Sequence, residues 1–154
     1  MAESKYGKYI VTQPLDIPKD VEDEAERRHA ESLVSIAYAD GKTIKGASLS
    51  TGAFWHLPFD GVSDSVIKEA HTHPFDEVLT YFGSNPDDPH DLGGELEMWL
   101  EDEKYILDKS CFVLAPRGLR HCPLRVLKVD RPFLFLAFSV TLKYIKDNVN
   151  WDIH

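Results

Sequence analysis

The sequence predicts an all-β domain of the sandwich or barrel type. Apolar residues alternate along many short stretches, and turn-forming Gly, Pro, Asn and Asp residues separate these stretches. No long stretch of the sequence repeats apolar residues at helical spacing. The chain of 154 residues is long enough for one domain with a proper core, and it shows no internal repeat.

The N-terminal part holds the one segment with helical character. Residues 20–32 are charged and free of Pro and Gly, which favours a turn or two of helix. A strand is expected at 33–39, where Val34, Ile36 and Tyr38 alternate with smaller residues. A hairpin signal at Asp40-Gly41 follows, and a second strand is expected within 43–55.

Seven more short strands are expected before the C-terminal tail. They are predicted at 66–73, 77–82, 94–100, 104–107, 112–115, 121–129 and 133–142. Residues 84–94 are rich in Pro, Gly and Asp, which predicts a loop without regular structure. This loop either supplies substrate contacts at the mouth of a barrel or is a solvated acidic loop.

The net charge, the hydropathy and the cysteines of the chain limit its possible partners and cellular location. The net charge of −9 argues against nucleic acid and anionic membranes as partners. The N-terminus lacks the apolar core of a secretory signal, and the longest apolar run, 133–140, is too short to span a bilayer. We therefore expect a cytoplasmic protein. Cys111 and Cys122 flank one predicted turn, and reduced thiols are expected there in preference to a disulfide bond.

Three histidines and one carboxylate form a candidate metal-ligand set. On a strand, His71 and His73 leave the same face, and Glu77 has the same parity four residues on. His121 follows the 116–118 turn and begins another predicted strand. Two strands of one sheet can thus aim four donors into one cavity, a set that suits divalent Fe, Mn, Ni, Zn or Co. The alternative is that these are scattered surface histidines.

At these residues the sequence resembles the cupin superfamily, in its small single-domain, metal-binding form. The first cupin motif is Gly, five residues, His-x-His, three or four residues, Glu, six residues, Gly. His71, His73 and Glu77 match, Gly83 closes the motif one residue early, and Ser65 stands at the leading Gly position.

The second cupin motif also resembles a stretch of this chain. It is Gly, five residues, Pro-x-Gly-x-x-His, three residues, Asn. Pro116, Gly118 and His121 match, while Ser110 stands at the Gly position and Arg125 at the Asn position. All four metal-binding positions are therefore kept, and the departures concern the framing positions of the turns.

The resemblance spans residues 44–139 and implies a cupin-type double-stranded β-helix, a jelly-roll barrel. The barrel is expected over 43–143, with an N-terminal extension at 1–42 packing on it and a C-terminal tail at 144–154. The resemblance also implies homodimers, for which strand 133–140 and the extension are candidate contacts. It implies one divalent transition metal per chain, bound by His71, His73, Glu77 and His121.

Further residues are candidates for catalysis and substrate contact. Glu77, as a charged ligand, and Arg125, whose guanidinium can hold a carboxylate, are the catalytic candidates. The alternative for Arg125 is a surface ion pair. Aromatic and apolar side chains are expected to line the substrate pocket, although each can equally be packed in the core: Trp55, Phe75, Tyr81, Met98 and Phe112.

The leading hypothesis is a metal-dependent enzyme that acts on a small organic molecule. A site with four protein ligands keeps open coordination positions, as catalytic sites do. Oxidation by dioxygen ranks slightly ahead of isomerisation, decarboxylation or lyase chemistry. No nucleophile elbow, phosphate loop or dinucleotide motif competes with it. The alternative is a non-catalytic binding or sensor protein that uses the same metal-containing pocket.

Overall fold

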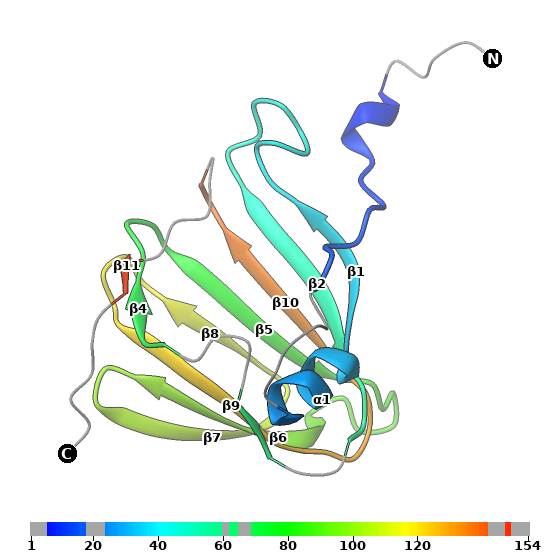
Figure 1. Ribbon diagram of the computed structural model, residues 1–154, viewed down its shortest axis with the longest axis vertical. Helices are drawn as coiled ribbons and strands as arrows, with labels where there is room; N and C mark the ends of the chain where they lie inside the picture. The colour runs from blue at the N-terminus through cyan, green and yellow to red at the C-terminus, as the bar shows by residue number, and fades with distance from the viewer. Residues whose placement is uncertain (1–5, 18–23, 60–61, 65–68, 142–146, 149–154) are drawn as a thin grey trace.

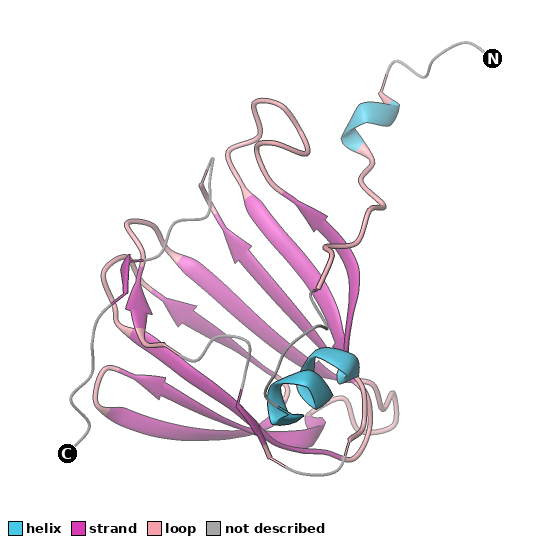
Figure 2. Cartoon of the chain, viewed as in Figure 1, coloured by secondary structure: helices cyan, strands magenta, loops and turns pink. Residues whose placement is uncertain are grey.

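The computed structural model confirms the prediction of an all-β fold, with two antiparallel sheets and the helix α1 (Glu24–Ser32) (Figures 1 and 2). It describes residues 6–17, 24–59, 62–64, 69–141 and 147–148. The five-stranded sheet has the order β1 (Leu33–Ala39), β2 (Ser50–His56), β10 (Phe133–Ser139), β5 (Glu77–Gly83) and β8 (Cys111–Ala115). The second sheet runs β11 (Asp147–Asn148), β4 (His71–Thr72), β9 (His121–Val129), β6 (Asp91–Leu100) and β7 (Glu103–Lys109), with β3 (Ser63–Asp64) also paired to β9.

The connection between β1 and β2 differs from the hairpin that Asp40-Gly41 predicts. Residues 41–46 form turns, and β2 begins at Ser50 instead of residue 43. The Asp40 carboxylate accepts hydrogen bonds from the backbone N–H groups of Lys42 and Thr43, both at 2.9 Å. This side chain closes a local turn, so it competes with the two-residue hairpin that the dipeptide favours.

Other bounds also differ from the predicted ones. Of the strand expected at 66–73, residues 66–68 lie outside the described part of the chain, and among residues 69–73 the strand comprises His71–Thr72. Strand β6 begins at Asp91, so the irregular loop comprises residues 84–90. The predicted tail contributes β11, which pairs with β4, while the other residues from 142 onward lie outside the described ranges.

The segment predicted as an N-terminal extension lies partly along the five-stranded sheet. Strand β1 forms the edge of that sheet beside β2. Residues upstream of the helix also contact β1, because the Gln13 carbonyl accepts a hydrogen bond from the Tyr38 amide at 3.0 Å. The Leu15 amide donates to the Ser35 hydroxyl at 2.8 Å. Residues 13–17 therefore lie beside the inner side of the sheet edge.

The apolar core lies between the two sheets. Its buried side chains come from β5 and β10 on one side and from β6 and β9 on the other, as Tyr81, Phe133, Met98 and Val126 illustrate. Cys111 and Cys122 form no disulfide bond with each other. In the described part of the chain, no helix combines the length and the apolar character needed to cross a bilayer.

Helix α1 lies at one end of this core (Figure 1). It buries His29, whose ring centroid lies 5.4 Å from that of His56 on β2. The His56 ring in turn stacks on Phe133 at 4.6 Å. The Nδ1 atoms of both histidines are buried and have no hydrogen-bond partner among the described residues.

Candidate metal centre

Four buried side chains converge between the sheets at the end of the barrel away from α1. His71, His73, Glu77 and His121 each offer one donor atom, and all four atoms lie within 4.8 Å of one another. Each of the four side chains is at most 3% exposed. The Glu77 Oε2 atom lies 3.2 Å from His73 Nε2 and 3.2 Å from His121 Nε2.

The ligands come from both sheets, which corrects the expectation that two strands of one sheet supply them. His71 on β4 lies opposite His121 at the start of β9, in the register of the second sheet. His73 follows β4 directly, and the chain then turns before Glu77 begins β5 in the five-stranded sheet. The shared parity of His73 and Glu77 therefore does not reflect one continuous strand, since a change of sheet lies between them.

The Pro-x-Gly turn of the second motif is hydrogen-bonded to the first motif. The Gly118 amide donates to the His73 carbonyl at 2.9 Å, and the Arg117 amide donates to the Asp76 carboxylate at 2.8 Å. Gly118 has a φ of +80°, a left-handed conformation that favours glycine. These bonds explain why the turn residues accompany the ligands: they fix the loop that precedes His121 against the loop that follows His71.

Backbone carbonyls orient two of the imidazoles. His71 Nδ1 lies 2.8 Å from the Glu69 carbonyl oxygen, and His121 Nδ1 lies 3.0 Å from the Leu119 carbonyl oxygen. Because a carbonyl oxygen only accepts, Nδ1 of each ring carries a hydrogen, and Nε2 is the ring atom turned toward the site. His73 is held differently, since its ring stacks on Phe75 at 4.8 Å.

Glu77 is ionised in this setting. Burial alone would raise the pKa of its carboxyl group, but hydrogen bonds from His121 and His73 lower it to about 2. The Ser139 hydroxyl donates to the other carboxylate oxygen, Oε1, at 3.2 Å. Glu77 therefore presents a full negative charge, with Oε2 turned toward the imidazoles.

The donor set fits one divalent transition metal ion. Two ligand atoms bound at about 2.1 Å and roughly at right angles are about 3 Å apart, close to the 3.2 Å separations around Glu77 Oε2. Three imidazole nitrogens and one carboxylate oxygen suit Fe, Mn, Ni, Zn or Co in the divalent state. The geometry supports a single ion at this site and does not distinguish among these metals.

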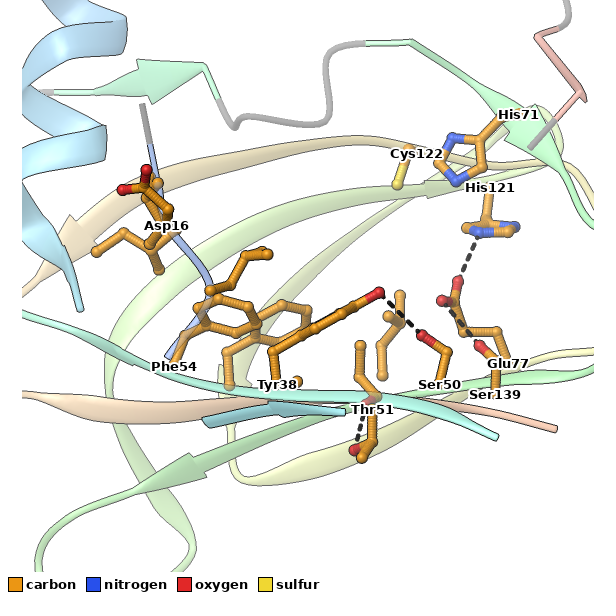
Figure 3. A pocket seen from close by; sticks show the side chains of 17 residues that line it. Asp16, Tyr38, Ser50, Thr51, Phe54, His71, Glu77, His121, Cys122 and Ser139 are labelled. Atoms are coloured by element: carbon orange, nitrogen blue, oxygen red, sulfur yellow. Dashed lines mark hydrogen bonds and ion pairs between the residues drawn. The ribbon is translucent and has the colours of Figure 1, made fainter. Parts of the chain in front are cut away.

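A cavity of about 400 Å³ opens beside the ligands (Figure 3). Its size lies within the roughly 300–1,000 Å³ range of small-molecule pockets. The lining comes from β1, β2, β5, β9 and β10 and from the segment before the helix. The residues that line it are Leu15, Asp16, Ile17, Leu33, Tyr38, Ser50, Thr51, Gly52, Phe54, His71, Glu77, Leu79, His121, Cys122, Phe135, Ala137 and Ser139.

The five residues predicted to line the pocket are placed elsewhere. Trp55 alternates with the buried Phe54 and His56, so it leaves the outer face of the sheet. Tyr81 and Met98 are buried in the core, while Phe112 is 69% exposed on the outer face of β8. Phe75 packs on the His73 ring without lining the cavity.

Arg125 also lies away from the cavity. It is exposed on β9 between the buried Leu124 and Val126, and its neighbour in register on β6 is Glu97. The alternation of the strand thus directs Arg125 to the outer face of the second sheet. The placement favours the surface role that was its alternative interpretation.

The cavity residues that sequence analysis missed lie mainly on β2 and β10. On β2 the signal was present, because Ser50, Gly52 and Phe54 share a parity that contains small and polar residues. On β10 the sequence reads apolar at nearly every position, so periodicity alone does not separate the inner Phe135 from its outer neighbours. Leu15 precedes any predicted element and carried no signal.

No family model and no curated protein matches the chain. DMSP lyase DddQ from Ruegeria pomeroyi DSS-3 is 21% identical with a TM-score of 0.40, over 66% of this chain and 43% of that one. Oxalate oxidase in complex with the substrate analogue glycolate is 13% identical with a TM-score of 0.49, over 86% and 58%. Bacillus subtilis oxalate decarboxylase is 18% identical with a TM-score of 0.47, over 75% and 28%.

The chain thus spans less than two thirds of each of these proteins, and likeness at this level carries no functional conclusion. The site itself is more informative. The two antiparallel sheets and the four converging donor groups fit a metal-binding cupin, as the two sequence motifs predict.

Proposed function

We propose that the protein is a metal-dependent enzyme that acts on a small organic molecule. The observation that carries this proposal is that His71, Glu77 and His121 line a cavity of about 400 Å³. A structural metal site is closed by its protein ligands, whereas a catalytic one keeps positions that substrate can reach. Here the ligand group faces a space large enough for such a substrate.

The chain's own residues prepare this site in three ways. His71, His73, Glu77 and His121 would hold the ion, which supplies Lewis acidity and, if it is redox-active, an electron-transfer couple. The Ser139 hydroxyl and the carbonyls that bind the imidazole Nδ1 atoms keep the donors in place. The apolar walls of the cavity limit the access of water.

The groups that line the cavity bear on the class of reaction. Oxidation by dioxygen stands slightly ahead of isomerisation, decarboxylation and lyase chemistry, because the latter call for a proton donor or acceptor beside the substrate. Among the described lining residues, the ionisable groups outside the ligand set are Asp16, Tyr38 and Cys122. This small supply of acid-base groups also favours the second candidate function, a non-catalytic metal-containing binding or sensor protein.

A substrate screen on metal-loaded protein, with and without oxygen, separates the two functions. For an enzyme, Glu77→Gln should cut turnover more strongly than metal occupancy, because an amide keeps the shape of the ligand but removes its charge. Turnover and bound metal are measured on the same samples. Tight binding of a small molecule with no turnover under Fe, Mn, Ni, Co or Zn would establish the binding protein instead.

We further propose that the protein is a homodimer. The outer face of the five-stranded sheet carries exposed apolar side chains on several strands, among them Val34, Ile36, Phe112, Leu114 and Phe138. An exposed apolar face of this kind on a folded domain is typical of an interaction surface. Two such sheets can pack face to face about a twofold axis.

A further inference from the structure

The inner face of the five-stranded sheet is layered by the register of its strands. Where β2, β10 and β5 lie side by side, opposite residues form rows across the sheet. Each row has its own chemistry, and the rows follow one another from the ligand end of the cavity toward α1. They are Ser50–Ser139–Glu77, Gly52–Ala137–Leu79 and Phe54–Phe135–Tyr81.

The first row makes the ligand end of the cavity polar. Ser139 donates to the Glu77 carboxylate at 3.2 Å. The Tyr38 hydroxyl on the neighbouring strand β1 lies 3.4 Å from the Ser50 hydroxyl, a long contact that turns its oxygen to this end. Figure 3 shows these oxygens on the same side of the cavity as His71 and His121.

The second row carries only small side chains at Gly52 and Ala137. Gly52 has no side chain, and a Cβ there would lie 2.8 Å from Phe54 Cε2 and 3.2 Å from Tyr38 Cδ2. The absence of this atom lets both rings lie close along the sheet. Ala137, opposite Gly52 in register, adds only a methyl group to the lining of the cavity, so the open space at this level lies over Ala137.

The third row makes the far end apolar and aromatic. The Phe54 and Phe135 rings stack with centroids 5.9 Å apart and an interplanar angle of 24°. Leu33 and, from the segment before the helix, Leu15 and Ile17 complete this end. The two rings and the aliphatic side chains offer only dispersion contacts and apolar surface to a ligand.

We infer that the cavity takes a small amphipathic molecule: an oxygen-bearing, metal-chelating group at the ligand end and a compact apolar body, such as a phenyl ring, over Ala137 against Phe54 and Phe135. This inference deepens the proposed function and rests on it for the chelating half. Ala137 is the residue that sets the length of the body, because it lines the cavity between the polar row and the aromatic row.

The charges around the cavity agree with this assignment. Among the described lining residues there is no lysine or arginine that would hold a second anionic group. The charged side chain at the far end is Asp16, which Figure 3 shows at the same end of the cavity as Phe54 and away from the ligands. A dicarboxylate would bring its second negative charge toward Asp16 and among apolar side chains, which is unfavourable.

Two hydroxamic acids test the inference on metal-loaded protein. Acetohydroxamic and benzohydroxamic acid share the chelating group and differ in the apolar body. The ratio of their dissociation constants, measured by calorimetric titration, therefore gives the contribution of the body to binding. We expect benzohydroxamic acid to bind at least about tenfold more tightly, because its ring leaves water for the apolar end. In Ala137→Leu the preference for benzohydroxamic over acetohydroxamic acid should fall below about threefold, since the larger side chain fills the space for the ring.

A matched control and a metal-free arm separate the two proposals. Ala53→Leu makes the same change on the outer face of β2 and should keep the full preference for benzohydroxamic acid. Bromobenzene soaked into crystals of metal-free protein should give a bromine signal beside Phe54 and Phe135, and Ala137→Leu should remove it. Metal binding without any advantage for the phenyl body would overturn this inference and leave the proposed function standing. Bromobenzene in the cavity of a protein that binds no metal would overturn the proposed function and support the apolar end alone.

Discussion

At the scale of single residues, Glu77 joins the two sheets at the site. It starts β5 in the five-stranded sheet, and its Oε2 atom lies 3.2 Å from two imidazoles that belong to or follow strands of the second sheet. Its hydrogen bonds with those imidazoles outweigh the effect of burial on its pKa. A buried carboxylate held in this way is prepared for a cation.

Ser139 positions this carboxylate, and its removal should weaken metal binding. Ser139→Ala takes away the hydrogen bond to Oε1, so Glu77 loses the contact that directs Oε2 toward the imidazoles. We expect the dissociation constant for the metal to rise about tenfold, as for other residues that orient metal ligands. Competition titration with a chromophoric chelator measures it.

Ser50→Ala is the matched control for this prediction. Ser50 lies opposite Ser139 in register, but its hydroxyl contacts Tyr38 and not Glu77. Metal affinity should therefore stay within about twofold of the wild-type value. Equal losses of affinity in the two variants would show that Ser139 acts through general packing.

The ligands were predictable from the sequence, and most of their surroundings were not. His71, His73, Glu77 and His121 stand at spacings that two motifs share, so residue types alone brought them together. Arg125 occupies a motif position too, but whether it faces the cavity depends on the parity of β9 past Cys122, whose φ is +67°. A local irregularity of this kind cannot be read from alternation in the sequence.

At the scale of elements, the two motifs meet at both ends. At the ligand end the Gly118 amide binds the His73 carbonyl. At the other end, the Ser110 hydroxyl accepts a hydrogen bond from the Gly83 amide at 3.0 Å. Position 83 also requires glycine, because the Cβ of any other residue would lie 2.0 Å from the Asp91 carbonyl oxygen. Gly118 and Ser110 of the second motif thus bind the first motif at its two ends, His73 and Gly83.

Strand positions were predicted well where a short alternating stretch lies between turn residues. β1 and β9 have the predicted bounds, while β5, β7, β8 and β10 differ from the predicted bounds by up to three residues at one or both ends. The start of β2 was missed because the Asp40 carboxylate organises the preceding turn through its own hydrogen bonds. Side-chain capping of this kind depends on geometry that local propensity does not describe.

The contact between His29 of helix α1 and His56 of β2 is expected to be sensitive to acid. Burial lowers the pKa of His29 to about 4, and burial together with the charge of His29 lowers the pKa of His56 to about 3. Both values lie below the ordinary 6.5, so the folded state binds fewer protons than the unfolded state once the pH falls below about 6.5. The contribution of the two neutral histidines to the free energy of unfolding is therefore fully present above about pH 6.5 and is lost as the pH falls toward their folded-state pKa values of about 4 and about 3.

Replacement of His56 should flatten this pH dependence. In metal-free protein, the free energy of unfolding of His56→Leu should fall by about 2 kcal/mol less than that of the wild type between pH 7 and pH 5. Urea unfolding at a series of pH values measures the difference. His90→Leu, a change at an exposed histidine, should leave the wild-type slope intact. Parallel curves for His56→Leu and wild type would show that His56 is not held neutral by the fold.

At the scale of the whole molecule, the two faces of the five-stranded sheet differ in what they can do. The inner face forms the layered cavity, whereas the outer face exposes apolar side chains such as Phe112 and Leu114. The sequence predicted both an enclosed site and a subunit contact, but it placed Phe112 on the wrong side. Because both faces of β8 are apolar, composition alone does not assign them.

The homodimer prediction is tested by mass in solution. Light scattering during gel filtration at micromolar concentration should give about twice the 17.5 kDa of one chain. Phe112→Asp with Leu114→Asp should yield monomers, because two charges cannot be buried unpaired in an apolar interface. Ile106→Asp, a change at another exposed apolar position, on β7 of the other sheet, should remain dimeric. A monomeric wild-type mass would contradict the prediction.

Metal analysis of natively purified protein tests the central claim most directly. The wild-type chain and the control His90→Ala should each carry about one divalent transition metal ion, because His90 is exposed and outside the converging group. His71→Ala with His73→Ala should carry none and still unfold cooperatively, since the apolar core between the sheets does not include these ligands. Full metal occupancy in that double variant would contradict the assignment of the site.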